Sequence, residues 1–320
     1  MKKTNKSKSY MKFVSTLTLV FILTTLFACD SEIEKGVMKS DLSKDIEMVT
    51  DYGTIIMRLS DETPKHRNNF IRLVNENFFD SISFHRVIKK FLIQTGDYAT
   101  KPSSLKNDSI DLPRNIDAEF RPNLFHKRGA LNAARMGDDV NPSRSSDGSQ
   151  FTIIQGKIQN DSTLNHMLSR VNFWRAKNNV INRPEYKNDF KKYKSLSTKI
   201  EDIEASKIVL HKEDEDLIRA DFTEISNKIK TYNIDSLANI ELNNMEKYNY
   251  PETHRKVYKS IGGSPHLDQN YTVFGEVIKG MKVVDSIADV ATDKTDKPIK
   301  NVYILKIKMI ERRNYSENID

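Results

Sequence analysis

Two long polar side chains interrupt an otherwise apolar stretch at 84–97. Arg86 and Gln94 lie in what reads as two short strands on either side of an exposed turn at Lys89 and Lys90. A guanidinium and an amide in such strands must find hydrogen-bond partners, or face a groove where a ligand supplies them. The groove would allow Arg86 to stabilise a polar group of a bound ligand. From these residues alone, a structural ion pair or a solvated strand edge is the alternative.

Two further motifs follow far downstream. Residues 147–153 read Asp-Gly-Ser-Gln-Phe-Thr-Ile, and 262–277 begin Gly-Gly-Ser-Pro-His-Leu-Asp. With 84–97 they resemble, in the same order, the signatures of the cyclophilin-type peptidyl-prolyl cis-trans isomerases, and the resemblance covers about 46–156 and 262–311. It implies a mainly β fold, a closed eight-stranded antiparallel barrel capped by two helices. Side chains fill a barrel of this size, so the site should lie on its outer wall.

The resemblance also implies roles for individual residues. Arg86 would point its guanidinium at the prolyl amide, Gln94 would orient Arg86 and contact the substrate backbone, and Phe91 would contact the proline ring. Further substrate-binding residues would be Leu92, Ala134, Arg135, Gln150, Phe151, Thr152, His266, Leu267 and Tyr271. Among these, Leu92, Phe151 and Leu267 would complete the apolar pocket, with Tyr271 at its edge. Gln150 and the backbone of Arg135 would hold the flanking peptide, and Ala134 would let it lie close.

The implied reaction needs no cofactor and no metal. Rotation about an X-Pro bond breaks amide resonance, at a barrier of about 18–20 kcal/mol, and takes tens to hundreds of seconds uncatalysed. A catalyst has to grip the ring and stabilise the twisted amide, which is preferential binding of the transition state. Besides Leu92, which stands where methionine is common and is a mild apolar swap, two positions depart from the family: Thr152 stands where an aromatic residue is usual, and His266 replaces the tryptophan of cyclosporin-sensitive members. The first should weaken the grip on proline, and the second the affinity for the drug.

The first residues of the chain resemble an export signal. The formal net charge of the 320 residues is +7, but five lysines and no acid fall in the first 28, which leaves +2 for the rest. An apolar run at 13–28 then leads to Cys29, the single cysteine. Leu26-Phe27-Ala28-Cys29 resembles a bacterial lipobox, so Cys29 is the expected lipidation site of a lipoprotein. The alternative is an ordinary signal peptide or an uncleaved anchor with an incidental cysteine.

This signal predicts where the protein acts. We expect a cell-envelope protein anchored to a membrane through lipid at Cys29, on the periplasmic side or at the cell surface. The acidic residues after Cys29 resemble export signals of some Bacteroidetes surface lipoproteins. One cysteine excludes an intramolecular disulfide framework, and the small charge left after the signal gives no indication of a nucleic-acid partner.

The elements around the motifs follow from local patterns. Segments 46–50 and 54–59 read as a hairpin across an Asp/Gly turn, and Thr63-Pro64 begins a helix. A second helix follows at 279–287, and 302–310 reads as the closing strand. The predicted divisions are a signal peptide (1–28), a flexible tether (29–44), the barrel (45–156 and 262–312), an insertion (157–261) and a tail (313–320).

The insertion at 157–261 contains no glycine, although the chain has 11, and its apolar residues recur at helical spacing. It predicts charged helices that form either a solvated decoration or an arm that binds partners. Trp174, Tyr186, Phe190 and Tyr193 could belong to its own small core or to a contact surface.

Two function classes remain. The first is an isomerase that assists the folding of exported, proline-containing polypeptides. The second is a non-catalytic barrel that binds such clients through the insertion, which Thr152 favours and intact Arg86, Phe91 and Gln94 disfavour. The seven histidines show no metal-ligand spacing and no Gly-x-Ser-x-Gly elbow exists, so a metalloenzyme or a hydrolase is not predicted.

Overall fold

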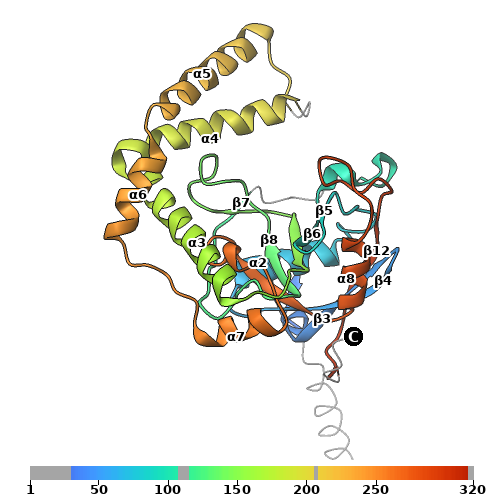
Figure 1. Cartoon of the computed structure of the whole chain (residues 1–320). Helices are drawn as coiled ribbons and strands as arrows, with labels where there is room; N and C mark the ends of the chain where they lie inside the picture. The colour runs from blue at the N-terminus through green and yellow to red at the C-terminus, as the bar shows by residue number, and fades with distance from the viewer. Residues whose placement is uncertain (1–29, 107–114, 205–207, 316–320) are drawn as a thin grey trace, which may run out of the picture.

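The computed structural model of this chain describes residues 30–106, 115–204 and 208–315. Cys29 and the predicted signal peptide lie outside the described residues. Within them, an antiparallel eight-stranded sheet curls around a hydrophobic core, and a group of helices projects from one side (Figure 1).

The sheet has the strand order β12-β3-β4-β11-β8-β10-β6-β5. Its strands are β3 (Lys44–Thr50), β4 (Gly53–Leu59), β5 (Arg86–Ile88), β6 (Leu92–Thr95), β8 (Ala130–Ala133), β10 (Phe151–Ile154), β11 (Val273–Lys279) and β12 (Ile304–Glu311). The predicted hairpin is β3 and β4, joined through Thr50 and Gly53. A two-stranded ladder of β7 (Asn115–Ile116) with β9 (Ser146–Asp147) lies apart from the sheet.

The prediction of a closed barrel is wrong, because β5 and β12 are the two ends of the ladder and do not pair as strands. β5 has only three residues, and its Val87 N–H donates to the carbonyl of Asp296 in a loop, at 2.7 Å. The segment before β5 reaches β12 irregularly, since the N–H of Ser81 donates to the carbonyl of Ile304 at 2.7 Å. Ser81 in this segment has φ 65°, which regular strand pairing does not allow.

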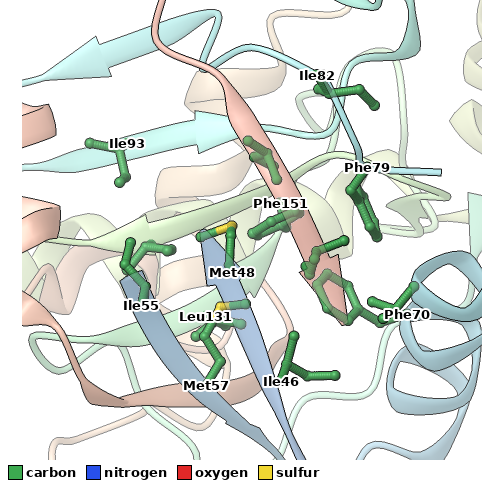
Figure 2. Packing of buried hydrophobic residues seen from close by; sticks show 14 of the residues in the cluster. Ile46, Met48, Ile55, Met57, Phe70, Phe79, Ile82, Ile93, Leu131 and Phe151 are labelled. Atoms are coloured by element: carbon green, nitrogen blue, oxygen red, sulfur yellow. The ribbon is translucent and has the colours of Figure 1, made fainter. Parts of the chain in front are cut away.

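The core lies inside the curled sheet. Strand alternation sends every second side chain inward, as with Ile46 and Met48 of β3, which are fully buried. Figure 2 shows these residues converging with Phe70, Phe79 and Phe151. The two predicted capping helices are α2 (Pro64–Asn75) and α8 (Met281–Ala288), and both bury apolar faces in this core.

The N-terminal residues differ from the predicted flexible tether. Residues 30–43 form β1 (Glu32–Glu34), β2 (Val37–Met38) and the 3-10 helix η1 (Lys39–Ser43). Val37 is fully buried in the main core, and the Asn75 amide donates to the Gly36 carbonyl at 3.0 Å. Val37, Leu42 and hydrogen bonds to Asn75 therefore hold the segment against the core and α2.

Five helices lie between the last two motifs: α3 (Asp161–Ile181), α4 (Pro184–Glu204), α5 (Lys212–Lys230), α6 (Ile234–Asn244) and α7 (Glu252–Ser260). α4 and α5, here called the arm, extend away from the sheet (Figure 1), whereas α3 packs against the 3-10 helix η4 (Pro265–Leu267) and α7 packs against α3. Three short 3-10 helices, η2 (Tyr98–Thr100), η3 (Ser103–Leu105) and η4 (Pro265–Leu267), complete the described elements.

The arm has its own aromatic contacts. Tyr193 stacks on Phe222 with ring centroids 5.0 Å apart, and Tyr186 packs on Tyr232 at 4.9 Å. Phe190 is buried, so three of the four aromatic residues singled out in the insertion serve its own packing. No helix in the described part of the chain is both long and apolar enough to cross a membrane.

Candidate active site on the outer wall of the sheet

A row of polar side chains crosses the outer face of the sheet. Arg86 of β5 pairs in register with Gln94 of β6, Gln94 with Thr152 of β10, and Thr152 with Asn132 of β8. The residues beside them in each strand, Val87, Ile93, Ile153 and Leu131, fill the core. Alternation therefore turns the whole row outward.

Arg86 is the cation of this row. Its side chain is 41% exposed, and its Nε lies 3.4 Å from Oδ2 of Asp296. Gln94 lies opposite Arg86, but its amide nitrogen donates to Gln150 Oε1 at 3.0 Å instead of contacting the guanidinium. One long contact leaves guanidinium donors free for a ligand on the outer face.

Gln150 is held by the turn that precedes β10. Oδ1 of Asp147 accepts from the N–H groups of Ser149 and Gln150, both at 2.8 Å. Gly96 packs against this turn with φ 91°, and a Cβ there would lie 2.2 Å from the Ser149 carbonyl oxygen. A glycine at 96 is required for the close approach.

An apolar cluster lies next to the polar row and outside the main core. This outer cluster consists of Leu92, Ala130, Ile154, Leu267 and Val273, with Phe91, Leu124 and Tyr271 packed against it. It unites the predicted pocket residues Phe91, Leu92, Leu267 and Tyr271. Arg86 and the outer cluster thus share one face, as a site that grips a proline ring and polarises its amide would require.

Phe151 is not part of the outer cluster. Its ring is 1% exposed and packs edge-on against Phe70 at 5.1 Å and Phe79 at 5.5 Å, inside the main core (Figure 2). Thr152, the next residue, faces outward, and its hydroxyl donates to Asn132 Oδ1 at 2.6 Å. Adjacent strand residues point to opposite faces, so Phe151 and Thr152 cannot both line the pocket.

His266 lies at the edge of the outer cluster. Its ring is 5.2 Å from Phe91 and 6.3 Å from Trp174 of α3, measured between centroids. Burial, together with the nearby charge of Arg170, lowers the pKa of His266 to about 4. The imidazole is therefore neutral near pH 7 and contributes an uncharged aromatic surface.

Ala134 and Arg135 follow β8. The Ala134 N–H donates to the Gln150 carbonyl at 3.0 Å, which joins this segment to the start of β10. The Arg135 guanidinium is turned away from solvent: it pairs with Asp138 at 2.7 Å and lies 4.5 Å from the Tyr271 ring centroid. Arg135 therefore fixes Tyr271, while its side chain is not free to hold a peptide.

A match to a family model shows which protein family this chain belongs to. The model described as "Cyclophilin type peptidyl-prolyl cis-trans isomerase/CLD" matches residues 45–173 and 245–309, more than half of the chain. The chain belongs to the cyclophilin family. The matched residues carry the polar row, the outer cluster and both capping helices.

Relatives of this cyclophilin share its sequence at low identity. A protein of Staphylococcus haemolyticus named "Putative peptidyl-prolyl cis-trans isomerase" is 24% identical over 277 residues, which cover 86% of this chain and 95% of that protein. A Streptococcus pyogenes protein with the name "Putative bifunctional phosphatase/peptidyl-prolyl cis-trans isomerase" is 24% identical over 298 residues, and the match covers 92% of this chain but only 45% of the longer protein.

Among solved structures, a Cryptosporidium parvum cyclophilin-type isomerase matches with TM-score 0.45 and 18% identity, over 84% of this chain and 99% of that one. The same protein has also been crystallised in the presence of the dipeptide Ala-Pro.

A buried network supports the cyclophilin loop that carries His266 and Leu267. Asp268 accepts from the His126 ring and the Tyr258 hydroxyl, both at 2.8 Å, and both partners are almost fully buried. The Tyr250 hydroxyl donates to the Pro265 carbonyl at 3.0 Å. Tyr258 belongs to α7, so the helical insertion contributes directly to the shape of the site.

Three residues at this cyclophilin site had no assigned role from sequence. Asp296 lies in a polar loop without a pattern, and Asp138, the shared partner of Arg135 and Arg144, is one of several acids in the 136–147 loop. For Trp174 the sequence predicts only a place in a small core or on a contact surface, although Trp174 is the single tryptophan of the chain. In the described parts of the chain, no three histidine, cysteine or acidic side chains are grouped to hold a metal ion.

Proposed function

We propose that this cyclophilin catalyses cis-trans rotation about X-Pro bonds in exported polypeptides and so assists their folding. The observation that carries the proposal is the shared face of the Arg86 guanidinium and the outer cluster around Phe91, Leu92 and Leu267. The cluster supplies an apolar surface for the proline ring, and the guanidinium lies beside it on the sheet.

The chemistry needs only binding. As the amide twists, its nitrogen regains a lone pair, and a donor aimed at that nitrogen is bonded more strongly in the transition state than in the ground state. Arginine stays protonated at every relevant pH and presents five donors in a rigid fork. Gln150, which accepts from Gln94, would hold the peptide backbone beside the ring.

The test compares Arg86 with Arg312, an arginine of similar exposure that lies elsewhere on the protein. Arg86→Ala should lower kcat/KM toward an X-Pro peptide by about 100- to 1,000-fold, which corresponds to about 3–4 kcal/mol of transition-state stabilisation. Arg312→Ala is the control, because Arg312 is 37% exposed and its Nε also lies 3.4 Å from a carboxylate, that of Asp45. A variant Arg86→Ala that keeps more than half of the parental kcat/KM would refute the role of Arg86.

A non-catalytic client-binding module is the second candidate. Thr152 and Asn132 form a buried, hydrogen-bonded polar pair on the outer side of the sheet, where an aromatic wall would grip proline better. Under this alternative the folded parent binds proline peptides and accelerates no isomerisation. The fragment should start at Asp30 in both experiments, because Val37 belongs to the core.

We further propose that the protein is a bacterial, Bacteroidetes-like lipoprotein of the cell envelope, anchored through Cys29. The support is the lysine-rich start, the apolar run and the cysteine that ends it. Cys29→Ala in the full chain should abolish incorporation of a labelled fatty acid and release the protein from membranes. Equal labelling of parent and variant would contradict the anchor.

A further inference from the structure

Trp174 brings the helical insertion to the edge of the substrate site. Its ring meets the His266 ring edge-on at 6.3 Å, and His266 packs against Phe91 at 5.2 Å. A series of aromatic ring contacts therefore runs from Phe91, in the turn before β6, to α3. A peptide whose proline ring lies on Phe91 would carry its neighbouring residues toward Trp174.

Two hydrogen bonds to the 136–147 loop hold the part of α3 that carries Trp174. The buried guanidinium of Arg144 donates to the Trp174 carbonyl at 2.8 Å and pairs with Asp138 at 2.6 Å. One turn further along α3, the Asn178 amide donates to the Pro142 carbonyl at 2.9 Å. α3 is thus bound to the loop at the rim of the site, and the tryptophan is preorganised there.

The same edge of the site has an excess of positive charge. Arg170 is exposed, its guanidinium carbon lies 5.1 Å from the Trp174 ring centroid, and no carboxylate in the described residues pairs with it. Arg135 and Arg144 share the single carboxylate of Asp138. The ring quadrupole attracts a cation held over its face, and the cation keeps its charge and N–H donors for an anion from solvent.

We propose that Trp174 and Arg170 extend the substrate site, so that it selects polypeptides with an acidic residue next to the proline. This selectivity rests on the proposed isomerase function. Trp174 covers the apolar part of the flanking residue, and Arg170 receives its carboxylate. The pair lies near the surface, where a single charge contact changes affinity modestly, so we expect kcat/KM to be about 3- to 10-fold higher for Glu than for Lys in that place.

The first experiment reads Trp174 directly, because the chain has one tryptophan. Residues 30–320 are titrated with two pairs of tryptophan-free peptides, in which Glu or Lys comes immediately before or immediately after the proline. The emission should change saturably, with half-saturation near the KM of the same peptide and at lower concentration for Glu. Unchanged emission at peptide concentrations that saturate catalysis would overturn the proposal.

The second experiment reverses the charge. Arg170→Glu should invert the preference so that Lys peptides are favoured, and Arg170→Gln should abolish it. Arg219→Gln is the control, since Arg219 is a half-exposed arginine of the insertion that pairs with Glu204 and Glu215 in the arm. Added salt should weaken the parental preference. An unchanged ratio of Glu to Lys in Arg170→Glu would overturn the charge selectivity.

A third variant separates a binding role from a structural one. Trp174→Ala should raise KM several-fold with a smaller effect on kcat, and Trp174→Phe should restore KM. If the parent isomerises X-Pro peptides while neither emission nor selectivity depends on the flanking charge, this inference fails and the proposed function stands. If the Trp174 emission responds to peptide but no isomerisation occurs, the isomerase proposal fails, and the proposal that Trp174 and Arg170 bind the peptide stands.

Discussion

At the scale of single residues, His266 shows how burial sets chemistry at the site. Its ring lies between Phe91 and Trp174, and its pKa is lowered to about 4 because the charged form loses hydration. Nδ1 of His266 has no hydrogen-bond partner among the described residues. The residue therefore contributes a neutral ring, and the positive charge of the site comes from arginines.

The lowered pKa of His266 predicts a pH dependence of stability. The unfolded chain binds this proton below about pH 6.5 and the folded chain only below about 4, so stability falls as pH falls through that window. Between pH 7 and 5 the loss due to His266 should be about 1–2 kcal/mol. This loss is measured by urea denaturation at pH 7 and pH 5 of the parent and of His266→Phe, a variant that keeps an aromatic ring.

Burial also lowers the pKa values of His66, His85 and His254, so the parent will lose more stability than His266 alone explains. The difference between parent and His266→Phe isolates the single site. Equal losses in both proteins between pH 7 and 5 would show that His266 titrates normally.

The residues of the site were predictable to the extent that motifs carry them. Arg86, Gln94 and Gln150 lie on the outer face as the resemblance implied, and Phe91, Leu92 and Leu267 meet in one cluster. Phe151 was assigned to the pocket together with Thr152, although strand alternation forbids neighbouring residues from sharing a face. The alternation rule could have settled that point from sequence. The contact of Arg86 in β5 with Asp296 in a distant loop depends on tertiary folding, which no local pattern predicts.

At the scale of elements, the junction of β6 with the turn before β10 positions the polar row. Gly96 follows β6 with φ 91°, and the Ser149 carbonyl lies where its Cβ would be. Asp147 orders the same turn through the N–H groups of Ser149 and Gln150. The close approach at Gly96 and the hydrogen bonds of Asp147 together place the Gln150 side chain within hydrogen-bonding distance of Gln94.

Gly96→Ala should destabilise the protein by about 2–4 kcal/mol, because it combines a left-handed backbone with a backbone clash. The measurement is the urea midpoint at constant m-value. Gly137→Ala is the control: Gly137 is exposed, and its added Cβ would meet the end of the Asp139 side chain, which can move. A loss below about 1 kcal/mol for Gly96→Ala would mean that the turn shifts to admit a methyl group.

Local pattern predicted some elements well and others poorly. The β3–β4 hairpin, α2 and α8 follow from turn residues and helical spacing, which act over a few residues. Polarity concealed the structure of 30–43, where Val37 is buried in the core and Leu42 packs against it. The insertion was predicted to be helical, but its docking depends on contacts such as that of Arg144 with Trp174, which no local pattern encodes.

At the scale of the whole molecule, the arm and the sheet differ in how much they bury. α5 of the arm buries only Ile225, whereas β4 lies inside the sheet and buries Ile55, Ile56, Met57 and Leu59. Few buried contacts mean a low free energy of local opening. The site is built on the sheet and α3, so its geometry does not require the arm to be rigid.

Amides of α5 should therefore exchange with deuterium at least about 100-fold faster than those of β4, a difference of about 2.7 kcal/mol in opening free energy. Hydrogen exchange read by mass spectrometry measures both in one sample. Peptides from α7, which contributes the buried Tyr258 to the support of the site, serve as an internal comparison within the insertion. Protection of α5 equal to that of β4 would show that the arm and the sheet unfold as one unit.

The central claim is that this cyclophilin turns over X-Pro bonds at the outer wall of its sheet. The most direct measurement is magnetisation exchange between the cis and trans forms of a short X-Pro peptide, with residues 30–320 at a small fraction of the peptide concentration. Without catalyst the exchange takes tens to hundreds of seconds. We predict an exchange rate that rises in proportion to added protein and saturates with peptide; a folded protein that leaves the uncatalysed rate unchanged would contradict the claim.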